Sequence, residues 1–195
     1  MQYPTLTNLY QLEHIQLLNN SYQKLLSKNL LANAVSDKEL AYQLFHAPFA
    51  LVSHNTASEP IFNYANLKAL ELFELNWEAF TQLPSKLSAE PVNQAEREQL
   101  LAQVTQNGFI DHYAGVRISS TGKRFMIKNA VVWNLVDDDN NYRGQAACFA
   151  EWECGDRHKF AYSLFANRFS FWRLDKHCGS STDTSDIRNS RRKQG

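Results

Sequence analysis

The sequence predicts an α+β fold: a five-stranded antiparallel sheet with short helices on one face, preceded by a helical segment. Three observations predict it. Apolar residues repeat at helical spacing early in the chain, two short apolar runs follow as a hairpin, and a long stretch of alternating residues occupies 109–152. The chain has 195 residues, 44% of them hydrophobic, which suits one globular domain with a short appendage.

The first segment, residues 1–47, is predicted to be helical. A stretch without Gly or Pro carries apolar residues three and four positions apart, which predicts an amphipathic helix over about 8–32: Leu12, Ile15, Leu18, Tyr22 and Leu25. Ser36 and Glu39 form a capping box that opens a second helix, and Pro48 ends it. The apolar stripe of the first helix needs a cover, from the domain or from a second copy, so we expect a homodimer through this helix.

The middle of the chain predicts a hairpin followed by helices. The apolar runs 49–55 and 60–66 flank a polar turn, as in two paired strands. Asn66 is placed to cap the next helix, because its side-chain oxygen can accept an amide of the first turn. Pro91 suits the first turn of a further helix that ends at Gly108.

Residues 109–152 predict three antiparallel strands joined by turns rich in Ser, Gly, Asp and Asn. In the central strand, strict alternation assigns one face to a single set of apolar residues, with Asn129 as a polar interruption: Phe125, Ile127, Val131, Trp133 and Leu135. That face is expected to be the core face.

Charge divides the chain near Gly155. Residues 1–155 hold 11 Lys and Arg against 16 Asp and Glu, whereas 156–195 hold 9 against 4. We therefore expect a basic tail over 155–195, disordered from about residue 179. Its aromatic residues Phe165, Phe169 and Trp172 have helical spacing and are expected to dock on the domain or on a second subunit; stacking on single-stranded nucleic acid or resting on a membrane are the alternatives.

Composition narrows the class of protein further. Twenty basic residues balance twenty acidic ones, which argues against a general nucleic-acid binder. No leader-like or 18-residue apolar stretch occurs, and three cysteines leave one thiol over under any pairing. These features favour a cytoplasmic protein with free thiols and no membrane span.

Several separated motifs, in order, resemble the MEKHLA domain, a PAS-like sensor module: HAPFALVSH, EPIFNYANLKALELFELNWEAFTQLPSKLSAEP, ERxxLL, YAGVRISSTGKRF and GQAACF. The resemblance covers about residues 40–153 and places the PAS-like domain at 48–154. It implies a sheet whose concave face, with short helices, encloses a ligand or serves as a docking surface. It brings no catalytic residue, and the homeodomain and zipper of the plant members have no counterpart here.

Seven polar or aromatic residues are candidate ligand contacts in such a cavity: Tyr64, Asn66, Trp77, Tyr113, Arg117, Trp133 and Cys148. Plain structural roles compete for each of them. Asn66 suits a helix cap, and both tryptophans suit the core. Arg117 can pair a ligand carboxylate bidentately or a nearby surface acid.

The sequence lacks the residue patterns that usually bind flavin, haem, zinc or calcium. Flavin and haem are disfavoured, because no Asn-Cys-Arg-Phe-Leu-Gln run occurs and residues 66–107 contain no His. His54 and His112 can still face a cavity. No metal site is expected, since the carboxyl-terminal Cys and His lack zinc spacing and the 137–148 segment has Tyr142 where a calcium loop needs Gly.

No catalytic motif is present, so we do not expect an enzyme. The function predicted is a PAS-like module that binds a small molecule or protein partner and signals through helix packing or dimerisation. A small enzyme using the same sheet concavity, or a pure protein-interaction scaffold, are the alternatives.

Overall fold

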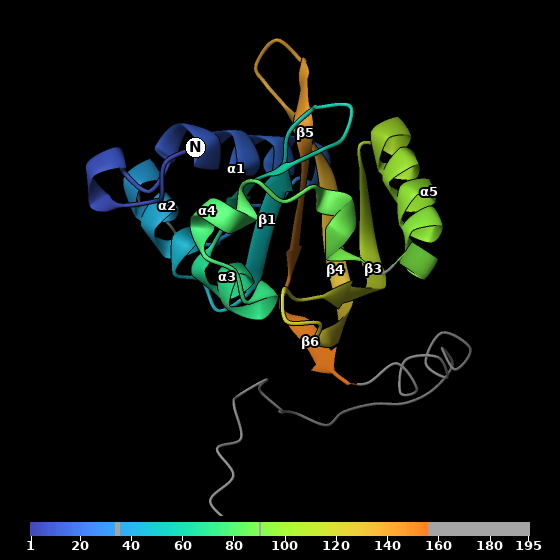
Figure 1. The fold of residues 1–195 in the computed structure, drawn as a ribbon. Coiled ribbons are helices and arrows are strands. Elements are labelled where there is room, and N and C mark those ends of the chain that lie inside the picture. The colour runs from blue at the N-terminus through green and yellow to red at the C-terminus, as the bar shows by residue number, and fades with distance from the viewer. Residues whose placement is uncertain (34–35, 90, 156–195) are drawn as a thin grey trace, which may run out of the picture.

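The computed structural model describes residues 1–33, 36–89 and 91–155, and the side chains of 91–97 and 101 are not described (Figure 1). The expectations for the tail, including its aromatic stripe, lie outside these residues. Within them the fold is the antiparallel α+β architecture that the sequence predicts.

The sheet has the strand order β2-β1-β5-β4-β3, with a short sixth strand beside β4. All pairs are antiparallel. The strands are β1 (Ala50–His54), β2 (Phe62–Ala65), β3 (Phe109–Ile118), β4 (Arg124–Val136), β5 (Tyr142–Phe149) and β6 (Glu151–Cys154). Because β1 pairs with β5, the amino-terminal hairpin joins the three long strands in one layer.

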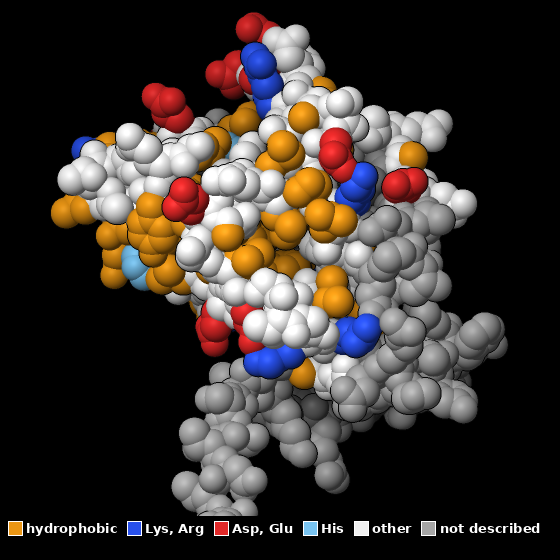
Figure 2. All heavy atoms as spheres, viewed as in Figure 1, with side chains coloured by type: hydrophobic (Ala, Val, Ile, Leu, Met, Phe, Trp, Pro, Cys, Tyr) orange, Lys and Arg blue, Asp and Glu red, His pale blue; other side chains and the backbone are white. Residues whose placement is uncertain are grey.

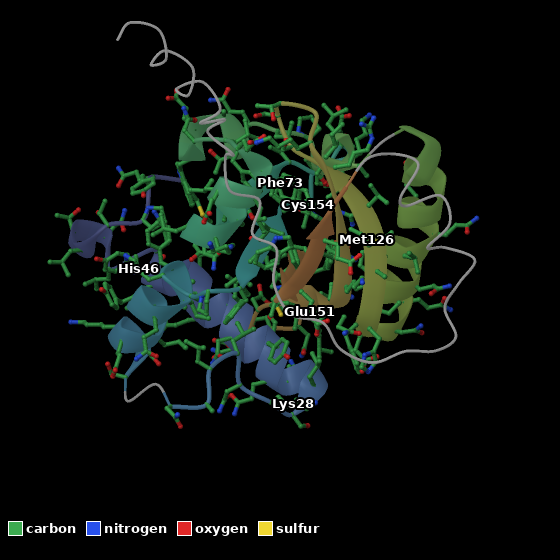
Figure 3. The ribbon with its side chains drawn as sticks, turned by 90° about the horizontal axis from the view of Figure 1, so that it is seen from below. Lys28, His46, Phe73, Met126, Glu151 and Cys154 are labelled. Carbon is green, nitrogen blue, oxygen red and sulfur yellow. The ribbon has the colours of Figure 1, made fainter. Side chains whose placement is uncertain are left out.

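The helices lie on both faces of this layer (Figures 1 and 3). They are η1 (Leu6–Asn8), α1 (Leu12–Leu26), α2 (Asp37–Phe45), α3 (Leu67–Phe73), α4 (Trp77–Phe80), η2 (Ser85–Ser88) and α5 (Pro91–Asn107). The predicted caps are confirmed: Ser36 accepts the Glu39 amide, and Asn66 accepts the Ala69 amide.

Helix α1 covers the back face of the sheet. Seen from below, Lys28 beyond its end and Phe73 at the end of α3 lie on opposite sides of the strands (Figure 3). The indole N–H of Trp133 donates to the carbonyl of Leu18 (3.3 Å), and the Tyr22 ring meets the indole edge-on at 4.9 Å. Ile15 and Leu18 are fully buried, so the apolar stripe of α1 is covered by its own sheet.

The front face is covered by α3, α4, η2 and α5. The Phe73 ring packs edge-on against Phe125 of β4 at 5.2 Å, and Val104 of α5 is buried in the same core. The turn between β3 and β4 is tied to the end of α3, because Glu74 accepts hydrogen bonds from Lys123, Thr121 and Ser119. These bonds lower the pKa of the Glu74 carboxyl to about 2.

A bulge in β4 changes which residues share a face. Tyr113 pairs with Ala130 and Gly115 with Ile127, so β4 uses one residue more than β3 between these pairs. Asn129, within that step, has a φ of 48°. The prediction from strict alternation is therefore wrong: Phe125 and Ile127 face α3 and α5, whereas Trp133 faces α1.

The thiols differ from the expectation that all three are free. Cys148 is free, whereas Cys154, the last residue of β6, is disulfide-bonded. In the described part of the chain, no helix has the length and apolar character needed to cross a bilayer.

Candidate functional site

A cavity of about 60 Å³ lies between the front face of the sheet and the helices α3, η2 and α5. Figure 2 shows apolar side chains gathered on this face, between α4 and α5. Its described lining is mostly apolar and includes Val52, Phe62, Phe73, Ile127, Val132 and Phe149. A dry cavity of about 150 Å³ accommodates benzene, so without side-chain movement this one suits a smaller molecule or a few waters.

Arg117 and Tyr113, both on β3, bring polar groups to the cavity wall. One guanidinium nitrogen donates to the Tyr113 hydroxyl and another to the carbonyl of Val116, each at 2.9 Å. The guanidinium carbon lies 5.4 Å from the centre of the Tyr113 ring, a cation–π contact. The arginine is thus held by its own strand and leaves further N–H groups for another acceptor.

Gly115 makes this pairing possible. A Cβ at this position would lie 2.4 Å from the Tyr113 hydroxyl oxygen and 3.2 Å from an Arg117 guanidinium nitrogen. Only the bare Cα lets the two side chains meet along the strand.

A polar network joins the cavity to α5. The Gln145 amide donates to the Asn134 side-chain oxygen and to the Thr105 hydroxyl, both at 3.1 Å, and the Asn134 amide donates to the Val104 carbonyl at 3.0 Å. Gln145 also lines the cavity. These bonds connect β5, β4 and the end of α5, so a molecule that contacts Gln145 touches the group that holds this helix.

His54 lines the cavity, as the sequence allowed, whereas His112 is exposed. The Nδ1–H of His54 donates to the carbonyl of Asn55 (2.9 Å), which orients the ring. No group of three or more His, Cys, Asp or Glu within the described residues is arranged to hold a metal ion.

Of the seven predicted contact residues, Tyr113 and Arg117 line the cavity. Asn66 is fully used as a cap: its amide donates to the Leu44 and Phe49 carbonyls, and its oxygen also accepts the Leu51 amide. Its structural role explains its burial without a ligand.

Tyr64 and Trp77 pack together near the amino-terminal segment, with ring centres 5.9 Å apart. The Trp77 indole N–H donates to the Met1 carbonyl (3.1 Å). The Tyr64 hydroxyl is buried without a hydrogen-bond partner in the described residues, and burial raises its pKa. Neither residue lines the cavity.

Trp133 and Cys148 lie on the back face, under α1. Cys148 pairs across the strands with Val131, which shares a face with Trp133. Burial raises the pKa of the Cys148 thiol to about 12. At neutral pH the thiol is therefore protonated, the less reactive form, and it points away from the cavity.

Sequence reasoning missed two parts of the site. Gly115 and Gln145 look ordinary in the sequence, because their importance depends on cross-strand neighbours that the register determines. It also missed the link between α1 and β1, where His14 Nε2 lies 2.8 Å from the Ser53 hydroxyl oxygen. Since Ser53 donates its proton to Asn63 (2.6 Å), the His14 nitrogen is the donor.

Comparison with known families confirms the resemblance that the sequence motifs indicate. A family model described as the MEKHLA domain matches residues 12–154. The chain belongs to the MEKHLA family. The match begins at the first residue of α1, so the MEKHLA unit includes the helix on the back face as well as the sheet.

The chain is similar to plant homeobox-leucine zipper proteins. The chain is 27% identical over 134 residues to homeobox-leucine zipper protein HOX10 of Oryza sativa, covering 68% of this chain and 16% of that protein. It is 28% identical over 120 residues to homeobox-leucine zipper protein ATHB-14 of Arabidopsis thaliana, covering 60% and 14%. The chain thus spans less than a fifth of the relatives' length.

Solved structures show the same fold as this MEKHLA chain. A PAS domain of a protein from Colwellia psychrerythraea superposes with a TM-score of 0.51 at 13% identity, covering 57% of this chain and 92% of that one. A structure titled for a flavin analogue in a light-oxygen-voltage domain gives 0.50 at 12% identity, covering 65% and 91%. The fold is therefore PAS-like.

Proposed function

We propose that this MEKHLA chain is a sensory module that binds a small molecule in the cavity at the front of its sheet. The observation that carries the proposal is the mostly apolar cavity with Arg117 and Tyr113 at its wall. Ligand sites commonly combine an apolar lining with a few placed polar groups, and this wall has that composition.

The proposed output is a change in helix packing. Gln145, at the cavity, belongs to the network that holds the end of α5, and Val132, in its lining, precedes Trp133, which holds α1. A ligand that prefers one arrangement of these contacts shifts the population of helix positions.

The test of ligand binding is native mass spectrometry of freshly purified protein. We expect a small molecule to co-purify and to dissociate on denaturation. Its loss in Arg117→Gln, with the circular dichroism spectrum unchanged, would assign it to the cavity. Protein that is free of any bound molecule, and that fails to bind small molecules added later, would count against the proposal.

A homodimer through α1 is a further part of the proposal. In the structure the stripe of α1 faces its own sheet, so pairing requires the helix to leave Trp133 and pair with a second copy. Light-scattering mass of the full chain and of a form lacking residues 1–35 tests it. A dimeric full chain and a monomeric truncated form are expected; equal masses would contradict helix-mediated pairing.

The small cavity volume favours protein docking as the second candidate function. A volume of about 60 Å³ is far below the roughly 300 Å³ or more that drug-sized ligands occupy. If docking alone is the function, cavity-filling Ala147→Leu leaves partner binding intact, whereas a ligand-dependent module loses its response.

A further inference from the structure

We propose that the ligand of this cavity is a small monocarboxylate, held by Arg117 at its charged end and by the apolar wall along its body. The inference rests on the proposed function and names the class of molecule that the site takes. Three properties of the wall carry it: an uncompensated charge, a prearranged guanidinium and a small apolar volume.

The charge of Arg117 has no counterpart in the described residues. An arginine guanidinium carries a positive charge and five N–H donors and has no acceptor. The ion pairs among the described residues join other side chains, and Arg117 takes part in none of them. Partly burying a cation beside an apolar cavity without a paired anion costs free energy. An anionic ligand is therefore expected to bind here more tightly than a neutral one.

The guanidinium is positioned before any ligand arrives. The Tyr113 hydroxyl and the Val116 carbonyl each accept one N–H at 2.9 Å, and the bare Cα of Gly115 gives them room. Fixing a long side chain in advance removes part of the entropy cost of binding. The remaining N–H groups suit the planar, two-oxygen acceptor of a carboxylate.

The volume of the cavity and the single positive charge in its described lining favour a small monoanion as the ligand. Arg117 is the one permanently charged side chain among the described residues that line the cavity. A phosphate dianion would bring a second negative charge into a wall made largely of aliphatic and aromatic groups, such as Phe62, Ile127 and Val132. A volume of about 60 Å³ limits the body to a short chain, with butanoate as a suitable probe.

The experiment compares butanoate with butanamide, which has the same heavy-atom shape and no charge. Each is titrated into the full chain, and dissociation constants are taken from NMR shifts of cavity-lining residues. Butanoate is expected to bind about tenfold more tightly, or more, because charge-assisted hydrogen bonds are the stronger kind. Arg117→Gln should remove this preference and leave butanamide binding unchanged.

Two further variants keep the test independent of folding defects. Tyr113→Phe retains the ring and removes the acceptor that positions the guanidinium, so butanoate should weaken several-fold while butanamide does not. Lys128→Gln is the matched control, since it removes a positive charge that pairs with Glu153 on β6 and does not line the cavity. Both ligands should bind it as they bind the parent chain.

The outcomes separate this inference from the proposed function. Equal binding of butanoate and butanamide, or full retention of the preference in Arg117→Gln, would overturn the carboxylate assignment and leave a small-molecule site standing. If neither butanoate nor butanamide shifts the cavity resonances, the small-molecule function fails as well, and protein docking becomes the supported candidate.

Discussion

Single residues fix the geometry of the sheet where two backbones approach closely. Gly144, in the first half of β5, has a φ of 124°, and a Cβ there would lie 1.9 Å from the backbone oxygen of His54. That oxygen belongs to β1, whose pairing with β5 joins the two halves of the sheet. The motif GQAACF therefore begins with a glycine for a steric reason.

We expect Gly144→Ala to lower the free energy of unfolding by about 2 to 4 kcal/mol, from the positive φ and the clash together. Gly122→Ala is the matched control, because its φ is 85° but nothing lies within 4 Å of its Cβ position. It should cost only about 1 kcal/mol. Urea unfolding measures both, and equal losses would show that the clash relaxes without cost.

His14 is a second residue whose environment has a measurable consequence. Burial between α1 and β1 lowers its pKa from the usual 6.5 to about 4. The folded chain thus keeps the ring neutral while the unfolded chain binds a proton between pH 6.5 and 4. The contribution of neutral His14 to the free energy of unfolding is complete above pH 6.5. It decreases by about 2 to 3 kcal/mol as the pH falls towards 4.

Urea unfolding at several pH values between 4 and 7.5 measures this loss. In His14→Gln, which keeps an N–H donor for Ser53, the part of the pH slope due to His14 should disappear. His112→Asn is the matched control, because it changes a histidine whose side chain is 80% exposed. A parent slope that survives in His14→Gln would assign the acid sensitivity to other groups.

At the scale of elements, the sequence predicts the features that depend on residues close together along the chain, such as helix caps and strands. Ser36 and Asn66 cap the helices that they were expected to cap, and the hairpin and the three long strands form near the predicted bounds. Arg117, one of the candidate ligand contacts, lies at the cavity wall, and its contact with a ligand stays a prediction. Local hydrogen bonds and alternation are short-range, so a single sequence contains them.

The faces on which the β4 residues lie could not be predicted, because they depend on the register between strands. The extra residue near Asn129 reverses the faces of half of β4, and it places Trp133 under α1 instead of in the cavity. Asn is one of the few residues that tolerates a φ of 48°, but many Asn residues in strands do not form bulges. Only the pairing with β3 shows where the bulge lies.

Helix α1 is part of the folded core, which gives a prediction at this scale. Leu18 is fully buried, and its carbonyl accepts the Trp133 N–H. Leu18→Ala should lower the free energy of unfolding by about 2 to 4 kcal/mol, and exposed Gln23→Ala by less than about 0.5 kcal/mol. Urea unfolding followed by Trp fluorescence checks both; a small loss for Leu18→Ala would mean that α1 contributes little to the core.

At the scale of the whole molecule, the sheet separates a cavity on one face from a docked helix on the other. The two faces alternate along the same strands: Val132 and Ala147 line the cavity, while Trp133 and Cys148 lie under α1. A change in strand position on the front therefore moves contacts on the back. This geometry is the physical basis for transmitting ligand binding to α1.

Cys148 reports on this transmission, because it is a free thiol under the helix. Its burial and raised pKa make it react slowly with thiol reagents until α1 moves away. Labelling should be at least about tenfold faster in Leu18→Ala, since each 1.4 kcal/mol of destabilisation raises the open population tenfold.

Butanoate should slow the labelling of Cys148 in the parent chain. It should leave the labelling rate of Ala147→Leu, whose cavity is filled, unchanged. The rate is followed by mass spectrometry of the peptide that contains Cys148, with Cys148→Ser as the blank. Labelling that responds to Leu18→Ala but not to butanoate would show that the helix opens independently of the cavity, and the proposed route from ligand to helix would then be wrong.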